Sequence, residues 1–304
     1  MDIISLLKEG NSYNNFNKLI EFGKFSHAYL IVSPDEDYNK AFCTLLALRL
    51  NCASVCRHCE SCVKILSGTH PDVLTFPKTK NFVVDDAKGV IEELNVLPML
   101  SNYKIFIINN FNKATVQAQN KLLKSLEEPP ENVIFLINAT TLETVLPTVQ
   151  SRTQKIELEP IDLQKLREFI IETDGKVNEN AILEGAGYPG ITLKYNENQT
   201  FLDNSNFIEN ILENMKSSKD VITYSSTFSI KEGFEERLNL LGHAFDKLLA
   251  KIAAGEPCEY TKEGIAMIFE KINEAKKQFL ANCNLNLIAD VLLLGILEVK
   301  YICK

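Results

Sequence analysis

The chain has 304 residues and a formal net charge of −8 at pH 7, and this length suffices for two or three compact units. Hydrophobic residues make up 45% and charged residues 24% of the sequence, as in ordinary soluble proteins, and no run suits a membrane span or a signal peptide. The acidic balance argues against a protein that grips nucleic acid alone, because phosphate binding needs a concentrated basic surface. We therefore expect a cytoplasmic protein that shares any DNA contact with partner proteins.

The first predicted strand is the apolar run at residues 28–32, and a polar segment at residues 33–40 follows it. In many ATPases such a strand leads into a phosphate loop, G-x-x-x-x-G-K-[ST], whose glycines let backbone N–H groups approach the phosphates. Here the segment reads Ser-Pro-Asp-Glu-Asp-Tyr-Asn-Lys, which lacks glycine and places three carboxylates where an anion would have to bind. The segment therefore does not match a phosphate loop, and we expect no nucleotide to bind there.

A cluster of cysteines follows the first long predicted helix, with the spacing C-x3-C-x2-C-x2-C. In a reducing compartment such a cluster indicates a metal site rather than disulfides. Four thiolates suit tetrahedral Zn²⁺, at about 2.3 Å from each sulfur, and leave no open position, so we predict a structural zinc. Two alternatives are a set of reduced structural cysteines and a site in which His58 replaces one of them. The predicted ligands are Cys52, Cys56, Cys59 and Cys62.

Another helix is predicted after the second strand, which we place just after His70. Asp85 or Asp86 is expected to cap this helix. Its apolar face is expected to consist of Val90, Ile91, Leu94 and Leu97.

Two further apolar runs, at residues 104–109 and 132–138, flank a helical stretch at residues 120–130. The runs are rich in β-branched and aromatic residues, which is typical of central strands in a parallel sheet. The helix between them ends at two prolines, which remove backbone donors. Strand, helix and strand therefore predict one βαβ unit of an α/β domain.

The amino-acid sequence in and after this unit is specific enough to suggest a protein family. Residues 121–135 read KLLKSLEEPPENVIF, and residues 147–153 read PTVQSRT. Both stretches resemble the bacterial DNA polymerase III clamp-loader proteins of the AAA+ class, the gamma/tau and delta-prime subunits. The resemblance implies an AAA+ RecA-like parallel sheet domain over residues 1–160 with a zinc module at about 52–62. It further implies a small helical lid over residues 161–200 and an all-helical collar for oligomerisation over residues 201–304. The polar stretch at residues 196–206 is expected to be a hinge.

The resemblance also implies a role for Ser151 and Arg152. In the clamp loader the matching Ser-Arg-Cys motif presents an arginine to the ATP of a neighbouring subunit, and here Thr153 replaces the cysteine. A guanidinium suits this task because its planar fork meets phosphate oxygens in pairs and stays charged. The alternative is an ordinary surface arginine before an edge strand.

A second departure from a hydrolysing ATPase lies at Asn109 and Asn110, after the predicted third strand. Active AAA+ proteins carry acidic residues there to hold Mg²⁺ and polarise water, and amides supply neither charge nor base. Asn138, where the family places a residue that senses γ-phosphate, is then expected to be only a hydrogen bonder at the end of its strand.

Together these features predict a non-hydrolysing clamp-loader subunit of the delta-prime type. Such a stator would assemble with gamma/tau and delta subunits and meet the sliding clamp and primer-template DNA through the complex. Two other interpretations stay open. One is an active gamma/tau-type ATPase with an aberrant phosphate loop, and the other is a zinc-bearing scaffold or DNA-binding protein outside replication.

Overall fold

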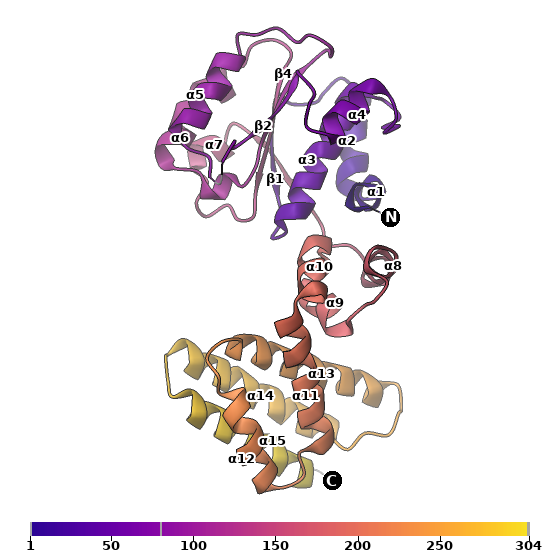
Figure 1. Cartoon of the computed structure of the whole chain (residues 1–304), viewed down its shortest axis with the longest axis vertical. Helices are drawn as coiled ribbons and strands as arrows, with labels where there is room; N and C mark the ends of the chain where they lie inside the picture. The colour runs from indigo at the N-terminus through magenta and orange to yellow at the C-terminus, as the bar shows by residue number, and fades with distance from the viewer. Residues whose placement is uncertain (1, 80, 303–304) are drawn as a thin grey trace. The chain divides into compact units, whose positions relative to one another are not determined.

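The computed structural model describes residues 2–79 and 81–302 and divides into two compact units (Figure 1). The first unit consists of the chain up to residue 176 together with residues 186–191. The second consists of residues 177–185 and the chain from residue 192 onward. All strands that the described residues form belong to the first unit.

The strands of the first unit are β1 (Ala28–Val32), β2 (Val73–Phe76), β3 (Lys104–Ile108), β4 (Val133–Ala139) and β5 (Gln154–Glu157). They form one five-stranded sheet in the order β2-β3-β4-β1-β5, and every neighbouring pair is parallel. Both β3 and β4 are buried along their whole length, as expected for a parallel sheet that is covered on both faces. The predicted α/β fold with a parallel sheet is thus confirmed.

The helices of this unit are α1 (Ile3–Lys8), α2 (Asn11–Glu21), α3 (Glu36–Asn51), α4 (Glu60–Leu66), α5 (Val84–Glu93), α6 (Val116–Glu127), α7 (Pro147–Gln150) and α8 (Leu163–Asp174), with a short 3₁₀ turn at Phe111–Lys113. Figure 1 shows α5, α6 and α7 on one side of the sheet and α2, α3 and α4 on the other. Successive residues of a strand face opposite sides. Accordingly, Ile105 packs in the core beneath α1–α4, and Phe106 packs in the core beneath α5–α7.

The predicted βαβ unit is present as β3, α6 and β4. Thr115 begins α6 by accepting a hydrogen bond from the N–H of Ala118 at 3.2 Å. Leu122 and Leu126 are buried against the sheet, and the helix ends at Glu127, just before the two prolines. Local apolar spacing and the proline stop therefore determine this unit.

The helix predicted after the second strand is α5, and its N-cap residue is not the one expected from the sequence. Val83 is the N-cap residue, and Asp86 lies in the first turn. Asp86 accepts hydrogen bonds from the N–H groups of Val83 and Lys78, both at 3.1 Å, so it satisfies backbone donors before the helix without being the capping residue. Asp85 instead pairs with Lys88 at the surface.

The end of α5 also corrects an expectation. The helix stops at Glu93, and Leu97 is 82% exposed instead of lying on a buried helical face. The cause lies far away in sequence, because the buried Asp72 carboxylate accepts hydrogen bonds from the N–H groups of Met99 and Leu100 at 2.7 and 2.6 Å. These bonds hold the segment as a loop that helical periodicity cannot foresee.

The second unit is helical and comprises α9 (Glu179–Gly185), α11 (Gln199–Asn214), α12 (Ser218–Phe228), α13 (Phe234–Ala253), α14 (Lys262–Leu280) and α15 (Leu285–Ile302). Helix α10 (Pro189–Glu197) begins among residues of the first unit and ends among those of the second. The expected hinge at residues 196–206 was wrong, because only Asn198 separates α10 from α11. Its side chain accepts from the N–H of Phe201, which is fully buried, so the polar residues cap and pack a helix.

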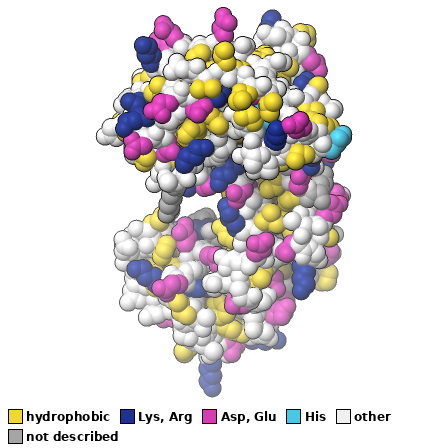
Figure 2. All heavy atoms as spheres, turned by 45° about the horizontal axis from the view of Figure 1, so that its top comes forward, with side chains coloured by type: hydrophobic (Ala, Val, Ile, Leu, Met, Phe, Trp, Pro, Cys, Tyr) yellow, Lys and Arg dark blue, Asp and Glu magenta, His cyan; other side chains and the backbone are white. Residues whose placement is uncertain are grey.

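Charged side chains of both signs are interspersed on the face shown in Figure 2. Within residues 2–79 and 81–302, no helix combines the length and apolarity that crossing a membrane requires.

Candidate functional site

The connection between β1 and α3 occupies the position of a phosphate loop, and it is short. β1 ends at Val32 and α3 begins at Glu36. Within the connection, the Ser33 hydroxyl donates to Asn39 Oδ1 at 2.7 Å, and Asn39 Nδ2 donates to the carbonyls of Ser33 and Ala139 at 2.8 and 3.1 Å. Ser33 and Asn39 are buried. Side chains therefore fix this turn from inside, where a phosphate loop would present free N–H groups to a ligand.

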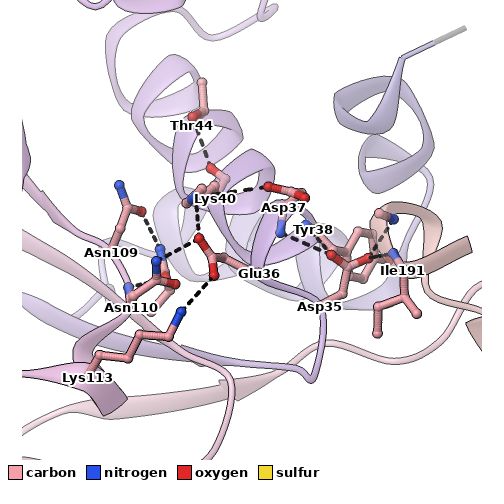
Figure 3. A network of polar contacts seen from close by, with 12 residues as sticks. Asp35, Glu36, Asp37, Tyr38, Lys40, Thr44, Asn109, Asn110, Lys113 and Ile191 are labelled. Atoms are coloured by element: carbon pink, nitrogen blue, oxygen red, sulfur yellow. Dashed lines mark hydrogen bonds and ion pairs between the residues drawn. The ribbon is translucent and has the colours of Figure 1, made fainter. Parts of the chain in front are cut away.

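The carboxylate of Glu36, the first residue of α3, is engaged by neighbouring groups (Figure 3). Glu36 is paired with Lys40 at 2.6 Å and with Lys113 at 3.1 Å, and it accepts from Asn110 Nδ2 at 2.7 Å. Burial acts to raise the pKa of Glu36, but the hydrogen bonds from Lys40, Asn110 and Lys113 outweigh it and lower the pKa to about 2. Glu36 therefore stays ionised at the start of α3, where both lysines and the Asn110 amide occupy its oxygens.

The two asparagines after β3 join this network. Asn138 Nδ2 donates to Asn109 Oδ1 at 2.6 Å, and the N–H of Asn110 donates to Asn138 Oδ1 at 3.0 Å. Asn110 itself has a left-handed backbone, with φ of 53°, a conformation that asparagine tolerates well. The amides therefore form a chain of neutral hydrogen bonds between β3, β4 and Glu36. Asn138 serves as a hydrogen bonder at the end of its strand, as predicted.

Arg152 lies between α7 and β5, at the opposite end of the sheet. Its Nη1 donates to the carbonyl of Thr148 at 3.0 Å, and its Nη2 pairs with Glu127 Oε2 at 3.2 Å. Ser151 is exposed, and its hydroxyl donates to the same Thr148 carbonyl at 3.2 Å. Thr153 donates back into α7, to the carbonyls of Val149 and Gln150. The Arg152 side chain is 30% exposed, so solvent or another molecule reaches it.

The direction of the parallel strands places Arg152 and the connection between β1 and α3 at opposite ends of the sheet. β1 and β5 are parallel, with Tyr29 paired to Gln154. The connection that contains Asp35 follows the C-terminal end of β1, whereas Arg152 precedes the N-terminal end of β5. A strand rises about 3.3 Å per residue, so roughly the length of a strand, about 15 Å, lies between them. Arg152 is therefore not placed to act on a ligand at the connection in its own chain.

The four predicted metal ligands come together between α3 and α4. Cys52 is the C-cap of α3, Cys59 is the N-cap of α4, and Cys62 lies on α4. The four Sγ atoms, Cys56 included, all lie within 4.8 Å of one another, and those of Cys52 and Cys56 are 3.7 Å apart. Tetrahedral zinc with Zn–S bonds of about 2.3 Å needs sulfur separations of about 3.8 Å. The cluster fits a metal ion.

The pKa values of the cysteines in the cluster are shifted in opposite directions. Hydrogen bonds from the Cys56 N–H and from Ser54 lower the pKa of Cys52 to about 6. Burial, together with the neighbouring Cys59 and Cys52 sulfurs, raises the pKa of Cys62 to about 12. Both directions describe the cluster without an ion. A bound cation would favour the thiolate form of every ligand, because it offsets the repulsion between them.

The backbone of the cysteine cluster turns sharply. Val55 and Arg57 both adopt left-handed conformations, with φ of 50° and 65°, which ordinary side chains disfavour. His58 Nδ1 lies 2.8 Å from the Cys56 carbonyl oxygen, and His58 is not among the grouped ligand atoms. Of the two alternatives considered from the sequence, substitution by His58 therefore finds no support in this geometry.

Three residues that bond to these sites carried no signal in the sequence. Glu127, which pairs with Arg152, follows an ordinary helical pattern. Gly190 and Ile191 bond to Asp35 from 155 and 156 residues away, so no local pattern links them.

Much of the chain is similar to known proteins. The family model described as "DNA polymerase III, delta subunit" matches residues 8–162, which is just over half of the chain. The chain is similar to DNA polymerase III subunit gamma/tau of Mycobacterium tuberculosis, with 33% identity over 189 residues, 57% of this chain and 33% of the relative. It is also similar to subunit tau of Bacillus subtilis, with 31% identity over 148 residues, 47% of this chain and 26% of the relative.

The chain thus spans a quarter to a third of the length of these curated relatives. Among solved structures, a gamma subunit-related DNA polymerase III protein of Thermotoga maritima aligns over 94% of this chain and 99% of its own, with 19% identity and a TM-score of 0.43. Since the family model covers more than half of the sequence and includes the whole parallel sheet, the chain belongs to the DNA polymerase III delta subunit family.

Proposed function

We propose that the chain is a non-hydrolysing, delta-prime-type subunit of the DNA polymerase III clamp loader, which presents Arg152 to ATP bound by a neighbouring subunit. The observation that carries this proposal is the polarity of the sheet. After the carboxyl end of β1, the buried carboxylate of Asp35 and the ion-paired carboxylate of Glu36 lie in place of a phosphate site, while a solvent-reachable arginine lies at the amino end of β5. An arginine so placed is suited to a phosphate that another molecule holds.

Arg152 is free to engage such a phosphate at small cost. Its ion pair with Glu127 lies at the surface, where Glu127 is 59% exposed, and exposed ion pairs contribute about 0–1 kcal/mol. A bound triphosphate offers more charge and a geometry that matches the guanidinium fork. Arginines supplied in trans accelerate phosphoryl transfer by about 10³–10⁵ in GTPases.

The proposed partners are the gamma/tau and delta subunits, with the sliding clamp and primer-template DNA reached through the complex. The mixed charges in Figure 2 and the net charge of −8 support a shared contact with DNA over an autonomous one. The proposed cofactor is one structural Zn²⁺ on Cys52, Cys56, Cys59 and Cys62, since four thiolates fill a tetrahedral shell and leave no position for a substrate.

A second candidate is an active ATPase of the gamma/tau type; the relatives from M. tuberculosis and B. subtilis carry the names gamma/tau and tau. Titration of the isolated chain with Mg-ATP distinguishes the two candidates. Binding together with hydrolysis above background would favour the second one.

The test of the proposal is ATP hydrolysis by the reconstituted complex of this chain with its gamma/tau and delta partners, in the presence of clamp and primed DNA. We expect Arg152→Ala to slow hydrolysis at the adjacent site by at least about tenfold, and Arg152→Lys to restore it only in part, because lysine lacks the planar fork. Size-exclusion chromatography would verify that every variant assembles.

Lys155→Ala is the matched control. Lys155 is a cation near Arg152, 43% exposed and paired within its own strand to Glu157, and its loss should leave hydrolysis unchanged. Normal turnover in an assembled Arg152→Ala complex would disprove the trans arginine.

A further inference from the structure

The carboxylate of Asp35 joins the first turns of two helices. Its Oδ1 accepts hydrogen bonds from the N–H groups of Asp37 and Tyr38 in α3, at 3.0 and 3.1 Å. Its Oδ2 accepts from the N–H groups of Gly190 and Ile191 in α10, at 2.6 and 3.2 Å. In Figure 3 the carboxylate lies between the start of α3 and Ile191. One anion thus satisfies four helix-terminal donors from segments far apart in sequence.

This arrangement differs from ordinary capping. Asp162 caps α8 in the usual way, with Oδ1 accepting from Gln164 and Lys165 of that helix alone, and it is exposed. Asp35 is fully buried and divides its two oxygens between two helices. A buried carboxylate is costly unless it is well paired, and here the positive ends of two helices supply the pairing.

Gly190 fits this close approach. A Cβ at this position would lie 2.5 Å from Asp35 Oδ1 and 3.0 Å from the Cβ of Asp37. Any larger residue would push the first turn of α10 away from the carboxylate. The requirement for glycine arises from the short N–H bond to Asp35 Oδ2, because Gly190 is not among the residues with positive φ.

The charge of Asp35 also reaches the surrounding aromatic rings. Tyr38 and Tyr188 pack edge to face with centroids 6.2 Å apart. Burial raises the pKa of Tyr188, and the nearby negative charge of Asp35 raises it further. Both hydroxyls are therefore kept neutral beside an anion.

We propose that Asp35 is a built-in anion, which fastens α10 to α3 at the position where a phosphate loop would hold a nucleotide phosphate. Helix N-termini after the first strand of such folds bind phosphates. In this chain the ligand is a side chain of the connection itself, so the first turn of α10 is held without nucleotide. This contact would hold the two helices together in the isolated chain, and it does not depend on Arg152.

The experiment compares hydrogen exchange of the α3 and α10 peptides in the full chain, wild type against Asp35→Asn and Asp35→Ala. We expect amides at the start of α10 to exchange roughly tenfold faster or more in both variants, since charge-assisted bonds are lost. Asp162→Ala is the matched control, which should loosen α8 and leave α10 unchanged. Wild-type protection of α10 in Asp35→Asn would overturn the proposal.

Anion rescue tests the chemistry directly. Inorganic phosphate, compared with sodium chloride of equal ionic strength, should restore protection of α10 in Asp35→Ala and leave the wild type unchanged. Loosening of α10 without rescue by phosphate would overturn the claim that an anion is required there.

Gly190→Ala approaches the contact from the other side and covers the case in which the Asp35 variants fail to fold. It should loosen the start of α10 as the Asp35 variants do. Its control is Gly242→Ala in α13, where an added Cβ meets nothing within 4 Å. Unchanged exchange in Gly190→Ala would contradict the close contact on which the proposal rests.

Discussion

Glu36 offers the most quantitative test of the network at the start of α3. The substitution Glu36→Gln keeps the shape of the side chain and removes its charge. Its neighbours lower the pKa from the ordinary value of 4.5 to about 2, which corresponds to about 3 kcal/mol at most. Because the side chain is 27% exposed, solvent screening reduces this figure, and we expect about 1–2 kcal/mol at pH 7.

The pH dependence has a definite sign. A carboxyl whose pKa is depressed by folding stabilises the folded state above its unfolded pKa, and this contribution disappears as the pH falls through the folded pKa. For Glu36 the window runs from about 4.5 down to about 2. The difference between wild type and Glu36→Gln should therefore shrink to less than half of its neutral value by pH 3.

Native-state hydrogen exchange of the α3 amides is the suitable assay, because the sequence contains no tryptophan and the chain has two units, which complicates global unfolding. Glu60→Gln is the control, since Glu60 forms the same 2.6 Å pair with a lysine four residues on but is 77% exposed. It should have little effect. An equal loss for Glu36→Gln at pH 7 and pH 3 would refute the ionic explanation.

Two further predictions concern the cysteine cluster and the exposed loop. Cys62→Ser should abolish the binding of about one zinc per chain, which metal analysis measures, whereas Cys258→Ser should not. A zinc content well below one equivalent in freshly purified wild type would contradict the site. Asp72→Asn should speed chymotryptic cleavage in residues 94–103, because an amide has one acceptor oxygen for the three N–H groups that the carboxylate now binds. Backbone hydrogen bonds outweigh burial and lower the pKa of Asp72, so the wild-type loop should loosen only at acidic pH.

Sequence patterns predicted those parts of the fold that local rules determine. The β3–α6–β4 unit follows from apolar periodicity and a proline stop within about 35 residues. The cysteine spacing likewise places its four sulfurs on one short segment, where the structure brings them together. In both cases the residues that determine the structure lie close together in the sequence.

Expectations failed where a distant polar group decides the local structure. Asp72 turns residues 94–103 into a loop from 27 to 29 residues away, although Leu97 continues the apolar spacing of α5. Residues 196–206 contain four asparagines, which suggested a hinge. The structure uses Asn198 as a cap and Asn204 as a partner of Glu236 at 2.6 Å. Amino-acid composition indicates that asparagines favour loops in water. It does not indicate which hydrogen-bond partners the folded protein supplies to them.

The Glu36 carboxylate at the start of α3 and the Asn110 amide after β3 depend on each other. Asn110 donates from Nδ2 to Glu36 Oε1 at 2.7 Å, and an aspartate there would bring two carboxylates to that distance. Like charges so close cannot both ionise easily. We therefore expect Asn110→Asp to speed exchange in α3 at pH 7 and to recover as the pH falls and one carboxyl takes up a proton. The double variant Asn110→Asp/Glu36→Gln should recover at pH 7 as well. If the single variant were as stable as wild type at neutral pH, the Asn110 amide and the Glu36 carboxylate would be independent of each other.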